Sequence, residues 1–156
     1  MSYVLKAVVA EAELLTAAAE GLPSARTAPL RHGLALLPMV GAFFRELTTD
    51  SSGVYPGFWA LPASLVPTLA EWSKVGPVAY VESEYFGGTG EENTAVWRDG
   101  RLALGPLHLL EGDPVSAQGS PVARALRELG IQPAGSSDEF AVAGLDQHRE
   151  SESWLS

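Results

Sequence analysis

The hydrophobic residues of the chain fall into short segments whose spacing distinguishes candidate strands from candidate helices. Apolar runs, several of them rich in β-branched or aromatic residues, predict strands at residues 3–9, 34–37, 78–86, 94–98, 101–104 and 107–110. Helix-forming residues, or apolar residues three and four positions apart, predict helices at residues 11–20, 40–47, 63–74 and 121–129. Stretches rich in Gly, Pro and polar residues separate these segments.

Turn signals are strongest in the middle of the chain. Asp99-Gly100 is typical of a two-residue hairpin turn, and the glycine-rich segment 87–93 predicts another hairpin loop. Residues 24–33 and 48–57 predict connecting loops. The strands within residues 78–110 are therefore expected to form a three-stranded antiparallel meander.

The order of the predicted elements indicates the fold class. Strands and helices mix without the strict alternation of a parallel sheet, which favours an α+β fold. We predict a single domain over residues 1–156, with a central antiparallel sheet (meander about 78–110) and three to four helices packed on it. The segment from about 143 is weakly patterned, and we expect it to be weakly structured.

Composition excludes several classes of protein. The chain has 10 Lys and Arg, 19 Asp and Glu, no Cys and a formal net charge of -9, and 46% of its residues are hydrophobic. That hydrophobic share is too high for a disordered chain, and the negative charge argues against a nucleic-acid partner. The longest apolar run, 34–44, is interrupted by Pro38 and Gly41 and is shorter than the roughly 20 residues that span a bilayer. We therefore expect a cytoplasmic protein with no membrane partner.

Two carboxylates, Glu82 and Glu84, lie two residues apart on the predicted strand 78–86. We favour the register that places them on the same face as Arg98, since both carboxylates then remain solvated. Paired carboxylates can serve acid–base or metal chemistry, but a solvated face with a cross-strand pair between Glu82 and Arg98 is the simpler interpretation.

Motifs that carry chemistry are missing from the sequence. The glycines of segment 87–90 are followed by Glu91 and Glu92 and by a strand, which argues against a phosphate-binding loop. Neither a zinc-binding histidine motif nor a Gly-x-Ser-x-Gly motif occurs. We predict no catalytic residue, no metal and no cofactor. A surface position is expected for His148, although a pair with a carboxylate is conceivable.

Large aromatic residues are unusual in a loop, yet Phe58 and Trp59 follow directly on the predicted loop 48–57. Either this region folds back over the core, or it presents an aromatic anchor to a partner.

The region around the glycine-rich hairpin resembles a bacterial family of small acidic proteins. The resemblance rests on residues 76–92, with their Tyr-Phe-Gly-Gly-x-Gly hairpin, on the strand that ends at Trp97, and on segments 121–130 and 138–154. It carries no catalytic residue over to this chain. Some small acidic proteins of this general kind are immunity proteins of polymorphic toxin systems, so the resemblance implies a similar role.

These observations predict a non-catalytic, immunity-like protein-binding module that neutralises a basic partner, such as a toxin domain, through an acidic surface. The candidate contact residues are the acidic side chains and one aromatic anchor: Glu82, Glu84, Glu91, Glu92, Asp138, Glu139 and Trp59. One alternative is a small hydrolase that uses Glu82, Glu84 and His148. Another is a subunit of a larger assembly, and the oligomeric state stays open.

Overall fold

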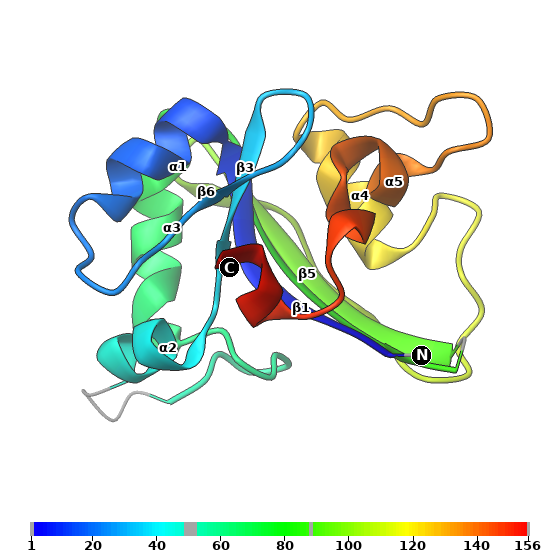
Figure 1. Cartoon of the computed structure of the whole chain (residues 1–156), viewed down its shortest axis with the longest axis horizontal. Helices are drawn as coiled ribbons and strands as arrows, with labels where there is room; N and C mark the ends of the chain where they lie inside the picture. The colour runs from blue at the N-terminus through cyan, green and yellow to red at the C-terminus, as the bar shows by residue number, and fades with distance from the viewer. Residues whose placement is uncertain (1, 49–52, 88, 156) are drawn as a thin grey trace.

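A six-stranded antiparallel sheet forms the centre of the protein (Figure 1). The computed structural model describes residues 2–48, 53–87 and 89–155. The strands lie in the order β2-β3-β1-β4-β5-β6. Their bounds are β1 (Ser2–Glu11), β2 (Ala28–Pro29), β3 (Leu34–Pro38), β4 (Val78–Phe86), β5 (Thr89–Arg98) and β6 (Arg101–Leu109). The predicted meander is confirmed as β4-β5-β6.

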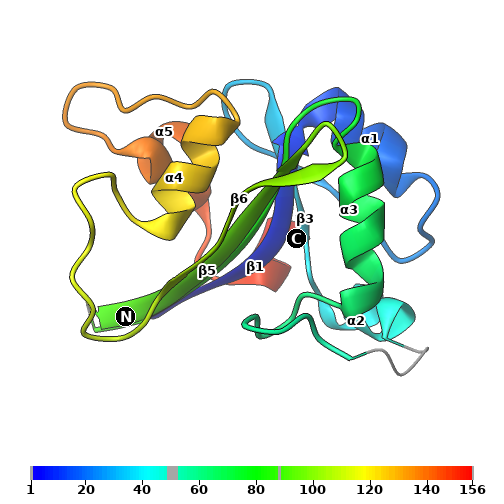
Figure 2. The same cartoon turned by 180° about the vertical axis from the view of Figure 1, so that it is seen from behind.

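Helices cover both faces of this sheet, as Figures 1 and 2 show. One face, here the α1 face, packs against α1 (Ala12–Ala19), α2 (Gly41–Leu47), η1 (Ala63–Leu65) and α3 (Val66–Trp72). The other, here the α4 face, packs against α4 (Pro121–Glu128), α5 (Glu139–Ala143), η2 (Leu145–Gln147) and η3 (Ser151–Leu155). The prediction of a single α+β domain with an antiparallel sheet is confirmed.

The two faces enclose separate hydrophobic cores. Val8, Tyr80 and Trp97 belong to the core of the α1 face, whereas Val81 and Val96 belong to that of the α4 face. Because the middle strands are covered on both sides, their central residues 7–10, 78–81 and 95–97 form short continuous apolar runs. Among the described residues no helix is long and apolar enough to cross a membrane.

The start of β1 is completed by a distant part of the chain. β3 pairs with only residues 7–11 of β1. Beyond that point the Val4 N–H donates to the carbonyl oxygen of Arg149 (2.7 Å), and the Lys6 N–H donates to Ser151 Oγ (3.1 Å). The C-terminal segment therefore covers the part of the strand that β3 does not reach.

Several local predictions need correction. Residues 24–33, predicted as a loop, contain β2, and most of the predicted loop 87–93 belongs to β5. Gly88, like residues 49–52 of the predicted loop 48–57, lies outside the described residues. The segment from about 143, expected to be weakly structured, contains η2 and η3 and buries Leu145 and Trp154.

The favoured register between the fourth and fifth strands is wrong. Val78 pairs with Trp97, and Glu82 pairs with Asn93, so Glu82 lies on the same face as Trp97. The core of the α1 face includes both Tyr80 and Trp97, which the expected register would have placed on opposite faces. Arg98 is paired with Glu128 (3.2 Å) instead of Glu82.

Candidate partner-binding surfaces

Glu82 is completely buried, and its carboxylate accepts four hydrogen bonds. Oε1 accepts from the Trp59 N–H (2.8 Å) and from Asn93 Nδ2 (3.0 Å). Oε2 accepts from the Ala60 N–H (2.7 Å) and from the Tyr80 hydroxyl (2.8 Å). Four hydrogen-bond donors can stabilise an ionised carboxylate that is shielded from water. Two of these donors, the Trp59 and Ala60 N–H groups, belong to the loop before η1. Glu82 therefore fixes that loop to the sheet and is not available to a partner.

The same loop contributes an aromatic side chain to the core. Phe58 is buried, with its ring 5.7 Å from the rings of both Tyr80 and His108. Gly57 has a φ of +89°, and a Cβ atom there would lie 2.9 Å from the His108 ring. His108 Nδ1 is 2.8 Å from Asn93 Oδ1. These contacts extend the network from buried Glu82 through Asn93 to the exposed imidazole.

Trp59 lies next to Phe58 but is only partly buried. Lys6 Nζ is 5.9 Å from the centre of its ring, within the range of a cation–π contact. Buried Phe58 confirms the expectation that this region folds back over the core. Trp59 remains partly exposed at the edge of that core.

One end of the α1 face extends past the helices (Figure 2). Glu84 and Glu91 are directly opposite each other across β4 and β5 and are partly exposed. Phe86 follows on the same face and is 55% exposed. Glu111 adjoins them, because its N–H donates to Glu91 Oε1 (3.4 Å). We call Glu84, Phe86, Glu91 and Glu111 the acidic end.

Glu92 lies on the opposite, α4 face and is 5% exposed. Its Oε1 accepts the Val122 N–H (2.9 Å) in the first turn of α4, where the helix dipole favours an anion. Its Oε2 accepts the hydroxyl of Tyr85. Burial, and then the bond to Glu92, raises the pKa of the Tyr85 phenol above its ordinary value, so the hydroxyl remains a donor.

Asp138 and Glu139 begin α5, on the same side of the sheet as Glu92. Asp138 is the N-cap and accepts the Ala141 N–H (3.0 Å). Glu139 is 8% exposed and pairs with Arg127 (3.1 Å). Together with Glu92 they line a cleft of about 540 Å³ between the sheet, α4 and α5. This cleft, the α4 cleft, is also lined by Tyr3, Tyr85, Val115, Gly119, Ser120, Ala123 and Phe140.

The seven residues expected at one surface thus divide between two places. Glu84, Glu91 and Trp59 remain accessible on the α1 face, where Glu82 is buried beneath the loop. Glu92, Asp138 and Glu139 meet in the α4 cleft. Sequence reasoning did not single out Asn93, His108 or Tyr3. The contacts of Asn93 and His108 depend on the register of the meander, and Tyr3 meets the α4 cleft from the opposite end of the chain.

The residues proposed for a hydrolase do not converge. Glu82 and Glu84 lie on the α1 face. His148 instead packs edge-on against Trp154, which belongs to the core of the α4 face, with 4.7 Å between ring centres. Within the described part of the chain, no three His, Cys, Asp or Glu side chains form a group able to hold a metal ion.

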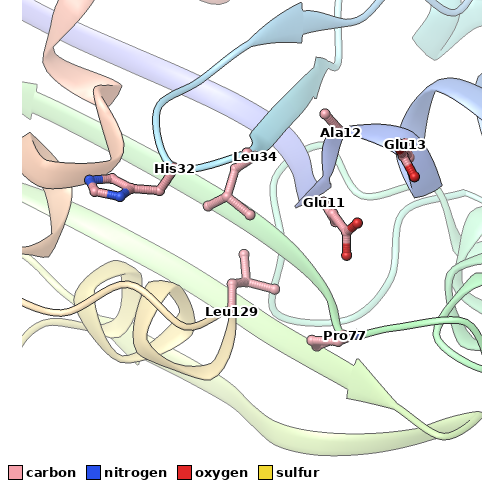
Figure 3. A pocket seen from close by; sticks show the side chains of 8 residues that line it. Glu11, Ala12, Glu13, His32, Leu34, Pro77 and Leu129 are labelled. Carbon is pink, nitrogen blue, oxygen red and sulfur yellow. The ribbon is translucent and has the colours of Figure 1, made fainter.

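A further pocket of about 580 Å³ lies beside the start of α1 (Figure 3). Its lining includes Glu11, Glu13, His32, Leu34 and Leu129. Figure 3 shows the His32 imidazole directed away from the two carboxylates, so these groups do not form an acid–base pair.

Comparisons with family models, with curated proteins and with solved structures found no match to this chain. The acidic end and the α4 cleft are therefore the two candidate binding sites in the described part of the protein.

Proposed function

We propose that this protein is a non-catalytic binding module that captures a basic protein through the acidic end of its α1 face. The observation that carries the proposal is the direct pairing of Glu84 with Glu91. None of the three ion pairs in the described residues includes either side chain. Like charges directly opposite each other destabilise a sheet, so this arrangement favours an incoming cation.

The surroundings of this pair suit a protein partner. Exposed Phe86 and the partly exposed ring of Trp59 offer apolar area next to the carboxylates. Aromatic anchors provide much of the binding energy in protein interfaces, while complementary charge accelerates encounter and discriminates against other partners. The net charge of -9 extends the attraction beyond the contact itself.

An immunity-like role gives this surface a biological purpose. An inhibitor that covers a basic functional surface of a toxin domain requires acidic and aromatic contact residues and no catalytic group. Support for this role comes from the acidic end and from the resemblance of the Tyr-Phe-Gly-Gly-x-Gly hairpin, whose strands carry Glu84 and Glu91.

Reversing one member of the pair separates binding from stability. In Glu84→Lys the new ammonium faces Glu91, so the free energy of unfolding should rise by about 0.2–1 kcal/mol. The same change should weaken capture of a basic partner. Glu20→Lys, at an exposed position after α1, changes the net charge equally and provides the matched control.

The test compares the immobilised wild type, Glu84→Lys and Glu20→Lys in an extract of the cells that produce the protein. A basic protein should be retained by the wild type and by Glu20→Lys and lost from Glu84→Lys. Its association rate should fall as added salt shortens the screening length from about 30 Å to about 8 Å. Equal retention by all three proteins, or an association rate independent of salt, would overturn the proposal.

A further inference from the structure

The α4 cleft is a second candidate site, separate from the acidic end. It is built from segments distant in sequence: Tyr3 of β1, Tyr85 of β4, Glu92 of β5, Ala123 of α4 and Phe140 of α5. Its volume of about 540 Å³ is within the range of pockets that hold small molecules. A lysine or arginine side chain alone would leave most of this volume empty.

The charges that line the cleft have one sign. Glu92, Asp138 and Glu139 contribute carboxylates, and no lining residue is Lys, Arg or His. Glu139 is neutralised by Arg127, whereas the two donors to Glu92 are the hydroxyl of Tyr85 and the N–H of Val122, neither of which carries a full charge. The cleft therefore keeps a net negative charge next to a carboxylate that is 5% exposed.

The remaining walls are aromatic and aliphatic. The rings of Tyr3 and Phe140 meet edge to face, with 5.2 Å between their centres, and Tyr85 lines the cleft as a third ring. Aromatic faces attract cations as well as apolar groups. The Tyr3 hydroxyl donates to the Leu145 carbonyl oxygen (2.9 Å), which ties this ring to η2.

We propose that the α4 cleft binds a small organic cation, an ammonium group carried on an apolar, aromatic body. The ammonium group lies near Glu92 and Asp138, where a free lone pair on each carboxylate accepts its N–H bonds. The body packs among Tyr3, Tyr85 and Phe140. This binding is independent of the basic protein proposed for the α1 face.

The probes for this proposal are phenethylamine, tryptamine and benzylamine, with phenethyl alcohol as a neutral analogue and 3-phenylpropanoate as an anionic one. Binding to the full chain is measured by ligand-observed NMR and calorimetry up to millimolar concentrations. At least one cation should bind, the alcohol should bind about tenfold more weakly, and the anion should not bind.

Two variants locate the site. Ala123→Leu places a larger side chain into the cleft from α4 and should abolish binding of the cation. Asp138→Asn removes one charge while retaining an equally good N-cap, and should weaken binding about two- to fivefold at an unchanged melting temperature. Glu84→Lys, on the other face, should leave it unchanged.

Four results would overturn the proposal. The first is failure of all three cations to bind, and the second is equal binding of the alcohol and the cations, which would show an apolar cleft without charge selection. The third is unchanged binding in Ala123→Leu. Loss of cation binding in Glu84→Lys would assign the cation to the acidic end and would also overturn it. Failure of the acidic end to capture a basic protein would not affect these cation-binding results, because the two sites lie on opposite faces of the sheet.

Discussion

Replacing Glu82 by Gln tests whether the buried carboxylate holds the loop before η1 on the sheet. The substitution preserves the shape of the side chain and replaces one acceptor oxygen by an NH₂ donor. If NH₂ takes the place of Oε2, it faces the Ala60 N–H; if it takes the place of Oε1, it faces the Trp59 N–H. A backbone N–H cannot reverse its direction, so either orientation leaves one buried donor without an acceptor.

The contacts set the size of the effect. A buried N–H without a partner costs about 1–3 kcal/mol, and each bond that loses its charged acceptor weakens by about 1 kcal/mol. Removing the charge recovers part of the desolvation cost, so the expected net loss is about 2–4 kcal/mol. For a domain of this size, that loss corresponds to a fall in melting temperature of about 10 °C.

The control is Glu84→Gln, two residues further along the same strand. Its side chain makes no hydrogen bond or ion pair within the described part of the structure, and neutralising it removes the repulsion from Glu91. Thermal unfolding followed by circular dichroism should show the large decrease for Glu82→Gln and no decrease for Glu84→Gln.

Hydrogen exchange locates the effect in the structure. In Glu82→Gln the amides of Trp59 and Ala60 should exchange faster, whereas those of the β4–β5 ladder keep their order of protection. A melting temperature within about 2 °C of the wild type, together with protected amides at Trp59 and Ala60, would refute the reasoning.

Two further predictions follow from other contacts. Gly57→Ala should destabilise the protein by about 2–3 kcal/mol, because the new Cβ contacts His108 in addition to the strain of a positive φ. Gly53→Ala is the control, since Gly53 also has a positive φ but a Cβ there would meet no atom within 4 Å. Chemical denaturation should show a loss of only about 1 kcal/mol in the free energy of unfolding of this control. Burial raises the pKa of Tyr3, Tyr80 and Tyr85. The contribution of these three tyrosines to stability should therefore be constant below about pH 10, where the unfolded phenols begin to ionise, and fall above it by up to about 1.4 kcal/mol per pH unit for each tyrosine. A urea midpoint that stays flat to about pH 11 would contradict this sign.

The capping and two-residue turn signals in the sequence predicted local structure well. Ser120 caps α4 through its bond to the Ala123 N–H (3.2 Å), with Pro121 in the first turn, as the sequence pattern indicates. Asp99 and Gly100 form the hairpin turn, both with positive φ. Each signal depends on residues within a few positions, so no tertiary information is required.

The β4–β5 register and the composition of the α4 cleft could not be predicted from the sequence, because both depend on contacts between separate segments of the chain. The expected cost of burying an unpaired carboxylate at Glu82 favoured the wrong register. In the structure that cost is offset by hydrogen bonds from Trp59, Ala60 and Asn93, which lie in other segments of the chain. The α4 cleft likewise assembles residues from both ends of the chain. Charge alone identified the acidic residues, but only the tertiary structure distributes them between two faces.

The contact between the beginning of β1 and the C-terminal segment constrains the order in which the molecule can assemble. Lys6 meets Ser151 across 145 positions of sequence, and β1 is also flanked by β3 and β4 in the middle of the sheet. During synthesis the first strand emerges early and must keep unpaired backbone groups until its last partner leaves the ribosome. A chain arrested before that point exposes a strand edge to its neighbours, so this fold depends on slow, long-range closure and on protection from self-association while it is incomplete.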